Sequence, residues 1–440
     1  MDKKDRLKLV HWVVDTARKK GADDASVTFS YERDISVSHR DGELEELSES
    51  TSNSLGLAIY ANSKYSSHST NDLRKDNLQK FIEEAVAMTK YLSKDEYRTL
   101  PDPKYYDYDE NIDLDINDKS YSRIDSDRRV DIAKKIEETT HKKDKRIISC
   151  TAGYGDNHFE TIRVRSNGFE GVNEGTVFYA GVEVTIQDDD GGRPQDWSYA
   201  TVRHFKDLPE VEYFAEEAIR RARSKLGQTK IESGRYDMIL ENRNAGRLIY
   251  ALYGPLQASS IQQKQSFLEG KKGERVGSEK LTIVDDPLIK QGLGSRLYDS
   301  DCIAAKKRVM IDKGILKDYY VDWYYGRKLG MEPTSGSRSN MVFGYGDKSM
   351  DDIIRGTGKG ILVTGFIGGN SNSTTGDFSY GIIGSYVEDG KIIKPVNEMN
   401  ISGNLSELMM SLTEMGNDPY EYSSMKSPTM LFKDVYFSGI

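Results

Sequence analysis

A repeated order of elements, helix then strands then helix, is the feature that most constrains the fold of this chain. The first copy begins with a helix that ends at Gly21. Its apolar residues have the spacing of one buried stripe: Leu7, Val10, Val14 and Ala17. Strands are predicted at Ala25–Ser38, Glu43–Ser50 and Ser54–Tyr60. A second helix follows the capping pair Asn71-Asp72, with an inward face of Leu78, Phe81, Ile82, Ala85 and Met88.

The second copy repeats this order. A helix is predicted over Ser126–Thr140, and another is started by Asp207 with Pro209 and ended by Gly227. The strands between them are predicted at Arg146–Tyr154, Glu160–Ser166, Gly171–Gln187 and Trp197–Phe205. The likeness lies in the architecture rather than in the letters. A duplicated α+β module, helix–antiparallel sheet–helix, is its simplest explanation.

We therefore expect four parts: a first repeat at 1–92, a linker or surface strap at 93–125, a second repeat at 126–230, and a β-rich domain at 231–440. The linker is rich in Asp, Tyr and Lys, so little burial is expected there. Beyond residue 233, turn signals such as Asp312-Lys313-Gly314 separate strand-like runs, and two helices are predicted near Asn244–Ser259 and Ser402–Met415. The overall class is α+β, with a mostly β C-terminal domain that is a barrel or a sandwich.

The composition restricts the cellular location and the classes of partner that we expect for this chain. The net charge of −9 and the lack of a long Lys/Arg run disfavour direct binding to nucleic acid. No run approaches the ~20 apolar residues that span a bilayer, and the polar N-terminus does not resemble a signal peptide. Only Cys150 and Cys302 are present, which fits a reducing compartment. We expect a cytoplasmic protein without a membrane partner.

The block Gly365–Gly381 is the strongest local signal for binding. Closely spaced glycines allow a backbone to approach another chain, and neutral Asn, Thr and Ser side chains can bond the amides of an extended peptide. The peptide-binding candidates are Gly368, Gly369, Asn370, Asn372, Thr375, Gly376, Asp377 and Ser379. The alternative is a long polar hairpin loop that binds nothing.

Other chemical motifs are weak. His158 and Glu160, predicted at a turn between strands, could touch a metal, although a solvated histidine is the more common case. Asp188–Gly192 lacks the spacing of a calcium loop and is predicted to be a hairpin tip. Arg355–Gly360 lacks the spacing of a phosphate loop, and no Gly-x-Ser-x-Gly elbow occurs. The remaining histidines lie on unrelated predicted elements and show no ligand pattern: His11, His39, His68, His141 and His204.

Several ordered motifs resemble those of the TldD/PmbA family, also called modulators of DNA gyrase, and the resemblance covers nearly the whole chain. The motifs are Ser166–Gly171, Leu281–Pro287, Gly326–Met331, Thr375–Ser379, Glu388–Ile392, Pro395-Val396 and Ile401–Leu405. The resemblance implies a duplicated α+β region followed by a β-rich domain. It also implies a cytosolic protease that acts on short or unfolded peptides inside an enclosed chamber.

The TldD branch of that family resembles a zinc peptidase, in which a His-Glu-x-x-x-His helix and a late cysteine hold the ion. The matching region here, Met238–Leu248, has no histidine, and Asp418–Phe432 has no cysteine. Both departures indicate the PmbA (TldE) branch, a subunit with neither catalytic residues nor metal ligands. Zinc is then expected in a TldD-like partner, in a heterodimer, or this chain forms a homodimer when that partner is missing.

The resemblance therefore predicts a non-catalytic, zinc-lacking subunit of a TldD/TldE-type metallopeptidase that contributes to the substrate chamber and is inactive alone. A stand-alone homodimeric peptide-binding module is the alternative. An enzyme with a site relocated to the region of His158 is a third hypothesis.

Overall fold

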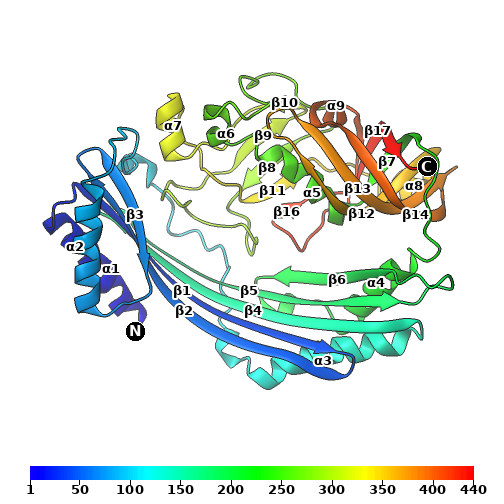
Figure 1. Cartoon of the computed structure of the whole chain (residues 1–440), viewed down its shortest axis with the longest axis horizontal. Coiled ribbons are helices and arrows are strands. Elements are labelled where there is room, and N and C mark those ends of the chain that lie inside the picture. The colour runs from blue at the N-terminus through cyan, green and yellow to red at the C-terminus, as the bar shows by residue number, and fades with distance from the viewer.

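The computed structural model describes residues 1–440, and both predicted repeats contribute to a single six-stranded antiparallel sheet (Figure 1). The strand order is β3-β2-β1-β4-β5-β6, so the first strand of each repeat lies at the centre. There β1 pairs with β4 from Ser26↔Arg165 to Arg40↔Thr151. The duplication is confirmed, and its two copies share one sheet. The strands are β1 (Asp24–Arg40), β2 (Glu43–Ala61), β3 (Lys64–Thr70), β4 (Ile147–Arg165), β5 (Glu170–Ile186) and β6 (Gln195–Val202).

Four helices cover one face of this sheet. They are α1 (Lys3–Lys19), α2 (Lys75–Thr89), α3 (Ser126–Lys143) and α4 (Val211–Arg223). Asp2 caps α1 and Asp125 caps α3, because each carboxylate accepts a backbone N–H of the first turn, from Asp5 (2.8 Å) and Arg128 (2.9 Å). Side chains alternate along a strand, so every second residue faces the helices and is buried. The opposite face of the sheet has no helix.

The structure corrects two predicted strand breaks. Glu43–Ser50 and Ser54–Tyr60 belong to the single strand β2, and β3 was not predicted. The outer part of β2 is a strand as predicted, but its continuity with the inner part was missed, because it extends beyond β3 and is exposed on both faces. Arg146–Tyr154 and Glu160–Ser166 likewise belong to β4. The turn-like Asp156 is tolerated inside that strand because Arg129 pairs with it (2.6 Å).

The segment 93–125 contains two short 3-10 helices, η1 (Pro103–Tyr105) and η2 (Tyr121–Arg123). Contrary to the expectation of little burial, it buries Leu100, Leu114, Ile116, Tyr121 and Ile124. Its tyrosines pack against both halves of the molecule, because the Tyr108 ring lies 6.0 Å from that of Phe169 and 5.1 Å from that of Tyr298. The segment therefore joins the sheet to the C-terminal domain.

The C-terminal domain contains a closed barrel rather than a sandwich. Its strand order is β14-β13-β12-β7-β17, and the pairs Asn400↔Ser438 and Ile401↔Phe437 close β14 onto β17. β15 pairs with the other edge of β17. The strands are β7 (Gly234–Leu240), β12 (Lys359–Ser371), β13 (Asp377–Glu388), β14 (Lys391–Asn404), β15 (Leu412–Met415) and β17 (Met430–Ser438).

A second sheet of this domain has the order β10-β9-β8-β11-β16. Its strands are β8 (Ile283–Asp286), β9 (Arg308–Asp312), β10 (Ile315–Leu316), β11 (Asn340–Phe343) and β16 (Met425–Lys426). The remaining helices are η3 (Phe205–Asp207), α5 (Asn242–Tyr253), α6 (Ala258–Gln262), α7 (Trp323–Leu329), α8 (Met350–Arg355) and α9 (Leu405–Met410). The helix predicted at Ser402–Met415 is shortened to α9, because strands occupy both of its ends.

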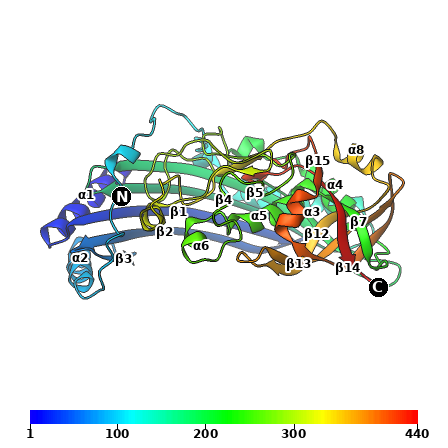
Figure 2. The same cartoon turned by 90° about the horizontal axis from the view of Figure 1, so that it is seen from above.

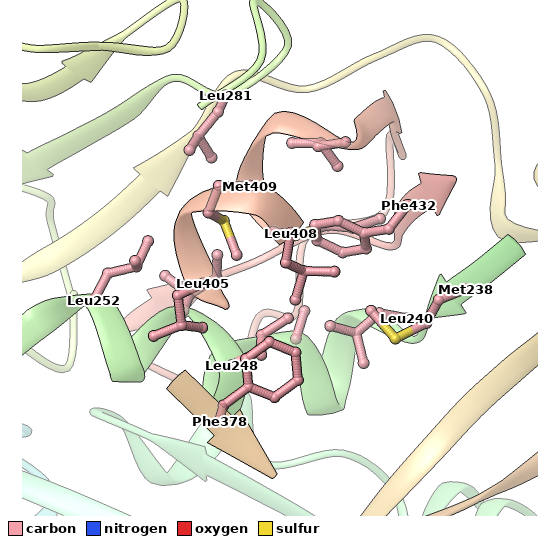
Figure 3. Close-up of a cluster of buried hydrophobic side chains, with 14 of the residues drawn as sticks. Met238, Leu240, Leu248, Leu252, Leu281, Phe378, Leu405, Leu408, Met409 and Phe432 are labelled. Atoms are coloured by element: carbon pink, nitrogen blue, oxygen red, sulfur yellow. The ribbon is translucent and has the colours of Figure 1, made fainter. Parts of the chain in front are cut away.

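Helices α5 and α9 pack together in the core of the C-terminal domain (Figure 3). Leu248 and Leu252 of α5 and Leu405 and Met409 of α9 are buried in one cluster that also includes Phe378 and Phe432 from the barrel. This burial of apolar surface fixes α5 relative to the barrel. The position of α5 determines the geometry of the candidate site.

The C-terminal domain lies over the helix-free face of the sheet, and the end that carries α1 and α2 projects beyond it (Figures 1 and 2). Arginines of this face hold the loop after β8. Arg163 donates to the carbonyl of Asp299 (3.1 Å), and Arg203 donates to that of Leu293 (2.7 Å). None of the helices is both long and apolar enough to cross a lipid bilayer.

Candidate functional site

The helix-free face of the sheet carries small and aromatic side chains below the C-terminal domain. Alternation along β5 and β6 places Tyr179, Trp197 and Tyr199 on this face. A pocket of about 480 Å³ lies there, lined by Thr151, Gly153, Tyr179, Gly181, Val182, Glu183, Trp197, Ser198 and Tyr199. A second hollow of about 260 Å³ shares Tyr179 and continues across the same sheet past Ser36 and Gly155. These small side chains leave room for a ligand that lies along the sheet.

Arg243, in the first turn of α5, lies over an aromatic pair of this pocket. Its guanidinium carbon is 3.3 Å from the centre of the Trp197 ring and 5.5 Å from that of Tyr199. The two rings are stacked, with centres 4.6 Å apart, and Tyr420 of the C-terminal domain approaches Tyr199 at 6.3 Å. Cation–π contact of this kind joins α5 to the sheet.

An ion-pair network fixes the start of α5. Arg221 of α4 donates to both carboxylate oxygens of Glu241, at 2.6 and 3.0 Å, and to Asp196 of β6 at 3.2 Å. Asn244 also donates to Glu241 (2.7 Å). Burial raises the pKa of Asp196, but Arg221 and Lys225 lower it more, so the net direction is downward. The charges of Arg221, Glu241 and Asp196 are compensated within the network, and the network holds the start of α5 against α4 and β6.

The two segments that the family resemblance assigns to a zinc site do lie side by side. Met430 of the late segment pairs with Leu240. Asn242, at the start of α5, donates to the carbonyl of Asp418 (2.7 Å) and accepts from the Ser427 hydroxyl (2.9 Å). The scaffold of such a site is therefore assembled in this chain.

The side chains at this place do not fit a divalent cation. Zinc sites use imidazole, thiolate and carboxylate donors, whereas α5 presents the guanidinium of Arg243, whose buried Nε and Nη2 have no hydrogen-bond partner. The Glu241 carboxylate is held by Arg221, and the Asp418 carboxylate accepts from the backbone N–H (2.9 Å) and the hydroxyl (2.7 Å) of Thr429. A dication here would face two guanidinium charges and carboxylates that are already paired.

The glycine-rich block is a β-hairpin rather than a loop, formed by β12, β13 and a turn between them. It flanks α5, because Arg247 donates to the carbonyl of Gly368 (2.9 Å). Gly368 and Gly369 both have positive φ, and the register shifts between Ile367 and Asn370. β12 pairs with β7 only as far as Val363, so the hairpin beyond it has an edge that is not paired with β7.

Half of the eight predicted peptide-binding residues stabilise the turn itself. Thr375 donates to Asp377 (2.7 Å), Asn404 also donates to Asp377 (3.1 Å), and these bonds lower the pKa of the Asp377 carboxyl. Asn372 accepts from the backbone N–H of Thr374 (2.9 Å), and Gly376 is buried.

The other four predicted residues are better placed for a ligand. Gly368 and Gly369 are exposed at the bulge. Asn370 and Ser379 are exposed cross-strand neighbours whose side chains make no hydrogen bond within the chain. A peptide could therefore bond these two side chains and the adjoining backbone.

Sequence reasoning missed the aromatic and arginine side of the site. Trp197 and Tyr199 alternate with the buried Ser198 and Ala200, and this pattern could have indicated a strand with an aromatic open face. Nothing in the sequence indicates that Arg243 lies on Trp197, because the two are on different domains. That contact depends on the tertiary fold.

His158 and Glu160 do not converge on a metal. Both lie within β4 rather than at a turn. His158 contacts Glu174 (3.2 Å), whereas Glu160 accepts from Arg6 (2.9 Å). The His158 contact and the proximity of Lys3 lower the pKa of Glu174 to about 2. The Asp188–Gly192 segment is a hairpin tip between β5 and β6, as predicted.

Three family models match the chain in order. They are PmbA/TldA metallopeptidase domain 1 at residues 25–89, the central domain at 119–226 and the C-terminal domain at 233–439. Among curated relatives, Metalloprotease PmbA of Escherichia coli O157:H7 is 28% identical over 423 residues, which cover 95% of this chain and 93% of the relative.

Solved structures agree with this match. A candidate modulator of DNA gyrase from Bacteroides thetaiotaomicron is 38% identical, covers 100% of both chains and superimposes with a TM-score of 0.96. TldE from Thermococcus kodakarensis, at 22% identity, shares the fold with a TM-score of 0.87, covering 98% of this chain and 100% of its own.

Proposed function

The chain belongs to the PmbA/TldD metallopeptidase family, in its PmbA (TldE) branch, and from this premise we propose that it is a non-catalytic subunit of a TldD/TldE-type peptidase. In this proposal a TldD-like partner supplies the hydrolytic zinc, and the assembly degrades or processes short or unfolded peptides in the cytoplasm. The E. coli relative is named a metalloprotease. We apply that name to the assembly rather than to this chain alone.

One observation carries the proposal. The two segments that the family resemblance assigns to a zinc site lie side by side, yet Arg243 lies 3.3 Å from the Trp197 ring centre at the start of α5, and the nearby carboxylates of Glu241 and Asp418 are paired. A cationic side chain cannot ligate zinc or lower the pKa of a bound water. Without an ion or an alternative base, α5 has no group that can activate water.

The helix-free face and the hairpin are suited to holding a substrate. We propose that a peptide in extended conformation lies in the pocket lined by Tyr179 and also contacts the exposed Asn370–Ser379 pair of the hairpin. The edge of β12 beyond Val363 is not paired with β7 and can bond an added strand, except at the carbonyls of Thr364 and Gly368, which accept from arginines of α4 and α5. The residues of this chain would then orient the peptide, while hydrolysis takes place on the partner.

Reconstitution tests the division of labour. We would purify this chain and the His-Glu-x-x-x-His relative from the same organism, and measure cleavage of an unfolded polypeptide such as casein by each alone and by the mixture. The mixture should cleave, a chelator should abolish the cleavage, and this chain alone should be inactive. Chelator-sensitive hydrolysis by this chain alone would refute the proposal.

Variants of the hairpin test the substrate role. Two neutral hydrogen bonds contribute roughly 1–3 kcal/mol, so the double variant Asn370→Ala/Ser379→Ala should raise KM of the mixture about tenfold and leave kcat nearly unchanged. Thr374→Ala is the matched control, because Thr374 is exposed on the same hairpin at the tip of its turn. An unchanged KM in the double variant would exclude these residues from the substrate site.

The alternative is a stand-alone homodimeric module that binds peptides without a protease partner. The unpaired β12 edge and the open sheet face would serve such a module equally well. It predicts that the zinc-bearing relative neither co-purifies with this chain nor gains activity from it. Chelator-resistant hydrolysis by this chain alone would instead favour an unrecognised catalytic site.

A further inference from the structure

Four potential metal ligands from three separate elements meet at one end of the sheet, on the face opposite the C-terminal domain. Glu137 and His141 lie one turn apart near the C-terminal end of α3. His39 comes from β1, next to the β1–β2 turn, and Cys150 comes from the start of β4. These residues lie more than a hundred positions apart at the extremes of the set, from His39 to Cys150, which is why His39 and His141 showed no ligand pattern. The structure corrects that interpretation.

Three of the donors lie close enough together to share one ion, and His39 lies beside one of them, Glu137. The Glu137 carboxylate lies 3.3 Å from Nδ1 of His39 through one oxygen and 3.2 Å from Nε2 of His141 through the other. The donor atoms of Glu137, His141 and Cys150 all lie within 4.8 Å of one another. Bond lengths of 2.0–2.3 Å in a tetrahedral zinc site imply donor separations of roughly 3.3–3.8 Å. Side-chain rotations that bring these donors together, with His39 moving toward the other three, would give that geometry.

Burial leaves one of these donors without a partner. His39 is 5% exposed, and its Nδ1 makes no hydrogen bond, although it points at Glu137. A buried polar atom without a partner costs about 1–3 kcal/mol, so an unexplained one needs a reason. Glu137 and Cys150 are also buried, whereas the His141 side chain is 36% exposed and offers an entry path for an ion from solvent.

We propose that His39, Glu137, His141 and Cys150 form a structural binding site for a divalent transition metal, with Zn²⁺ as the ion that best suits two imidazoles, one carboxylate and one thiolate. All four positions of a tetrahedral site are filled by side chains, which is typical of structural rather than catalytic zinc. On binding, the Cys150 thiol loses its proton to solvent and its sulfur ligates the ion. The ion would join α3 to β1 and β4.

The surroundings support such a site. Asp41, in the β1–β2 turn, accepts from the backbone N–H of Cys150 (2.9 Å) and lies 3.5 Å from Nε2 of His141. It therefore fixes the backbone of Cys150 at the site, and its carboxylate lies beside the same His141 nitrogen that would ligate the ion. The rival explanation is a cluster of histidine–carboxylate ion pairs, His39–Glu137–His141, that holds no metal.

This site is independent of the proposal that the partner subunit carries out hydrolysis. It lies in the N-terminal half, and protein side chains occupy all four coordination positions of the ion. Zinc bound here would not hydrolyse peptides. If this site binds zinc, the expectation that the chain holds no metal applies only to the C-terminal domain. A zinc measurement on the whole chain therefore has to be resolved by residue.

Metal titration of the full chain tests the proposal. After removal of metals with a chelator, ZnCl₂ is added and bound zinc is counted by equilibrium dialysis, and CoCl₂ is used as a spectroscopic probe. We expect one ion per chain, a tetrahedral cobalt spectrum and a thiolate-to-cobalt charge-transfer band. Cys150→Ser should abolish that band, and His141→Asn should weaken zinc binding about 100-fold or more.

A matched control is available on the surface. His11 contacts Glu170 at 2.7 Å in an exposed histidine–carboxylate pair, so His11→Asn should leave zinc binding unchanged. The proposal is overturned if no stoichiometric zinc binds, if His141→Asn binds as tightly as the wild type, or if cobalt gives an octahedral spectrum without the charge-transfer band. If Cys150→Ser does not fold, the cobalt spectrum of the wild type and the exposed His141→Asn variant still decide.

Discussion

Replacing Arg221 by methionine tests the ion-pair network that joins the sheet to α5. The guanidinium bonds Glu241 at 2.6 and 3.0 Å, Asp196 at 3.2 Å and the carbonyl of Thr364 at 3.0 Å. The Arg221 side chain is 5% exposed, and both carboxylates are 7% exposed. Removing one partner of a buried ion pair leaves an uncompensated charge and costs about 3–5 kcal/mol. We expect Arg221→Met to lower the free energy of unfolding by that amount.

The neighbouring residue provides a matched control. Arg220 lies on the same helix and pairs with Glu217 at 2.8 Å, but its side chain is 58% exposed. Exposed pairs contribute about 0–1 kcal/mol, so Arg220→Met should have a small effect. Equilibrium unfolding in urea measures both, with tryptophan fluorescence as the signal, because Trp197 lies in the same interface.

The pH dependence of the Arg221→Met effect gives an independent check. In the wild type the pKa of Asp196 is lowered overall, so its contribution to stability is present above the unfolded pKa near 3.8 and is lost as the pH falls. Without Arg221, burial acts with less opposition and the folded pKa rises. The penalty should therefore grow between about pH 4 and pH 7. A loss below about 1 kcal/mol, or a penalty that shrinks as the pH rises, would refute the argument.

Two further predictions concern one buried acid and one bulge. Burial and the nearby Asp301 raise the pKa of Asp299 from 3.8 to about 6, so its contribution to stability is lost as the pH rises through that window. Asp299→Asn should therefore be more stable than the wild type at pH 7 by up to about 3 kcal/mol, and equally stable below pH 4, in urea unfolding; equal stability at pH 7 would contradict this. Gly369 has a φ of +84°, and a Cβ there would collide with the Ser379 carbonyl, so Gly369→Ala should lower the midpoint of thermal unfolding more than Gly368→Ala, which meets open space. An equal effect of the two would argue against the bulge.

Local signals predicted the helices well because their apolar spacing is contained in a few residues. Val10, Val14 and Ala17 of α1 are buried as predicted. The predicted capping pair Asn71-Asp72 was wrong, because Arg74 precedes α2 and no side chain caps it. The strands were harder, because β4 continues through Asp156, whose charge is compensated by Arg129 from another element. A buried acid inside a strand resembles a turn until its partner is known. The outer part of β2 was predicted as a separate strand, because it has no buried face and so no alternation that connects it with the inner part.

The candidate site was only half accessible to sequence reasoning. The block was recognised from its glycines as a binding loop, whereas it forms a hairpin in which Thr375 and Asp377 bond one another within the turn. Trp197 and Arg243 meet across two domains, and the His39, Glu137, His141 and Cys150 cluster depends on the pairing of β1 with β4. Contacts between residues far apart in sequence are set by topology, and no local pattern records them.

The central pairing of β1 with β4 also has a consequence for folding during translation. β1 is complete at Arg40, yet its first partner in β4, Thr151, is synthesised roughly 110 residues later, which takes about 5–20 s at ordinary translation rates. During that interval the hydrogen-bonding edge from Ser26 to Arg40 has no neighbour in the nascent chain. The first repeat therefore cannot complete its sheet by itself, and a fragment that stops at residue 92 would present a long adhesive edge to any other copy.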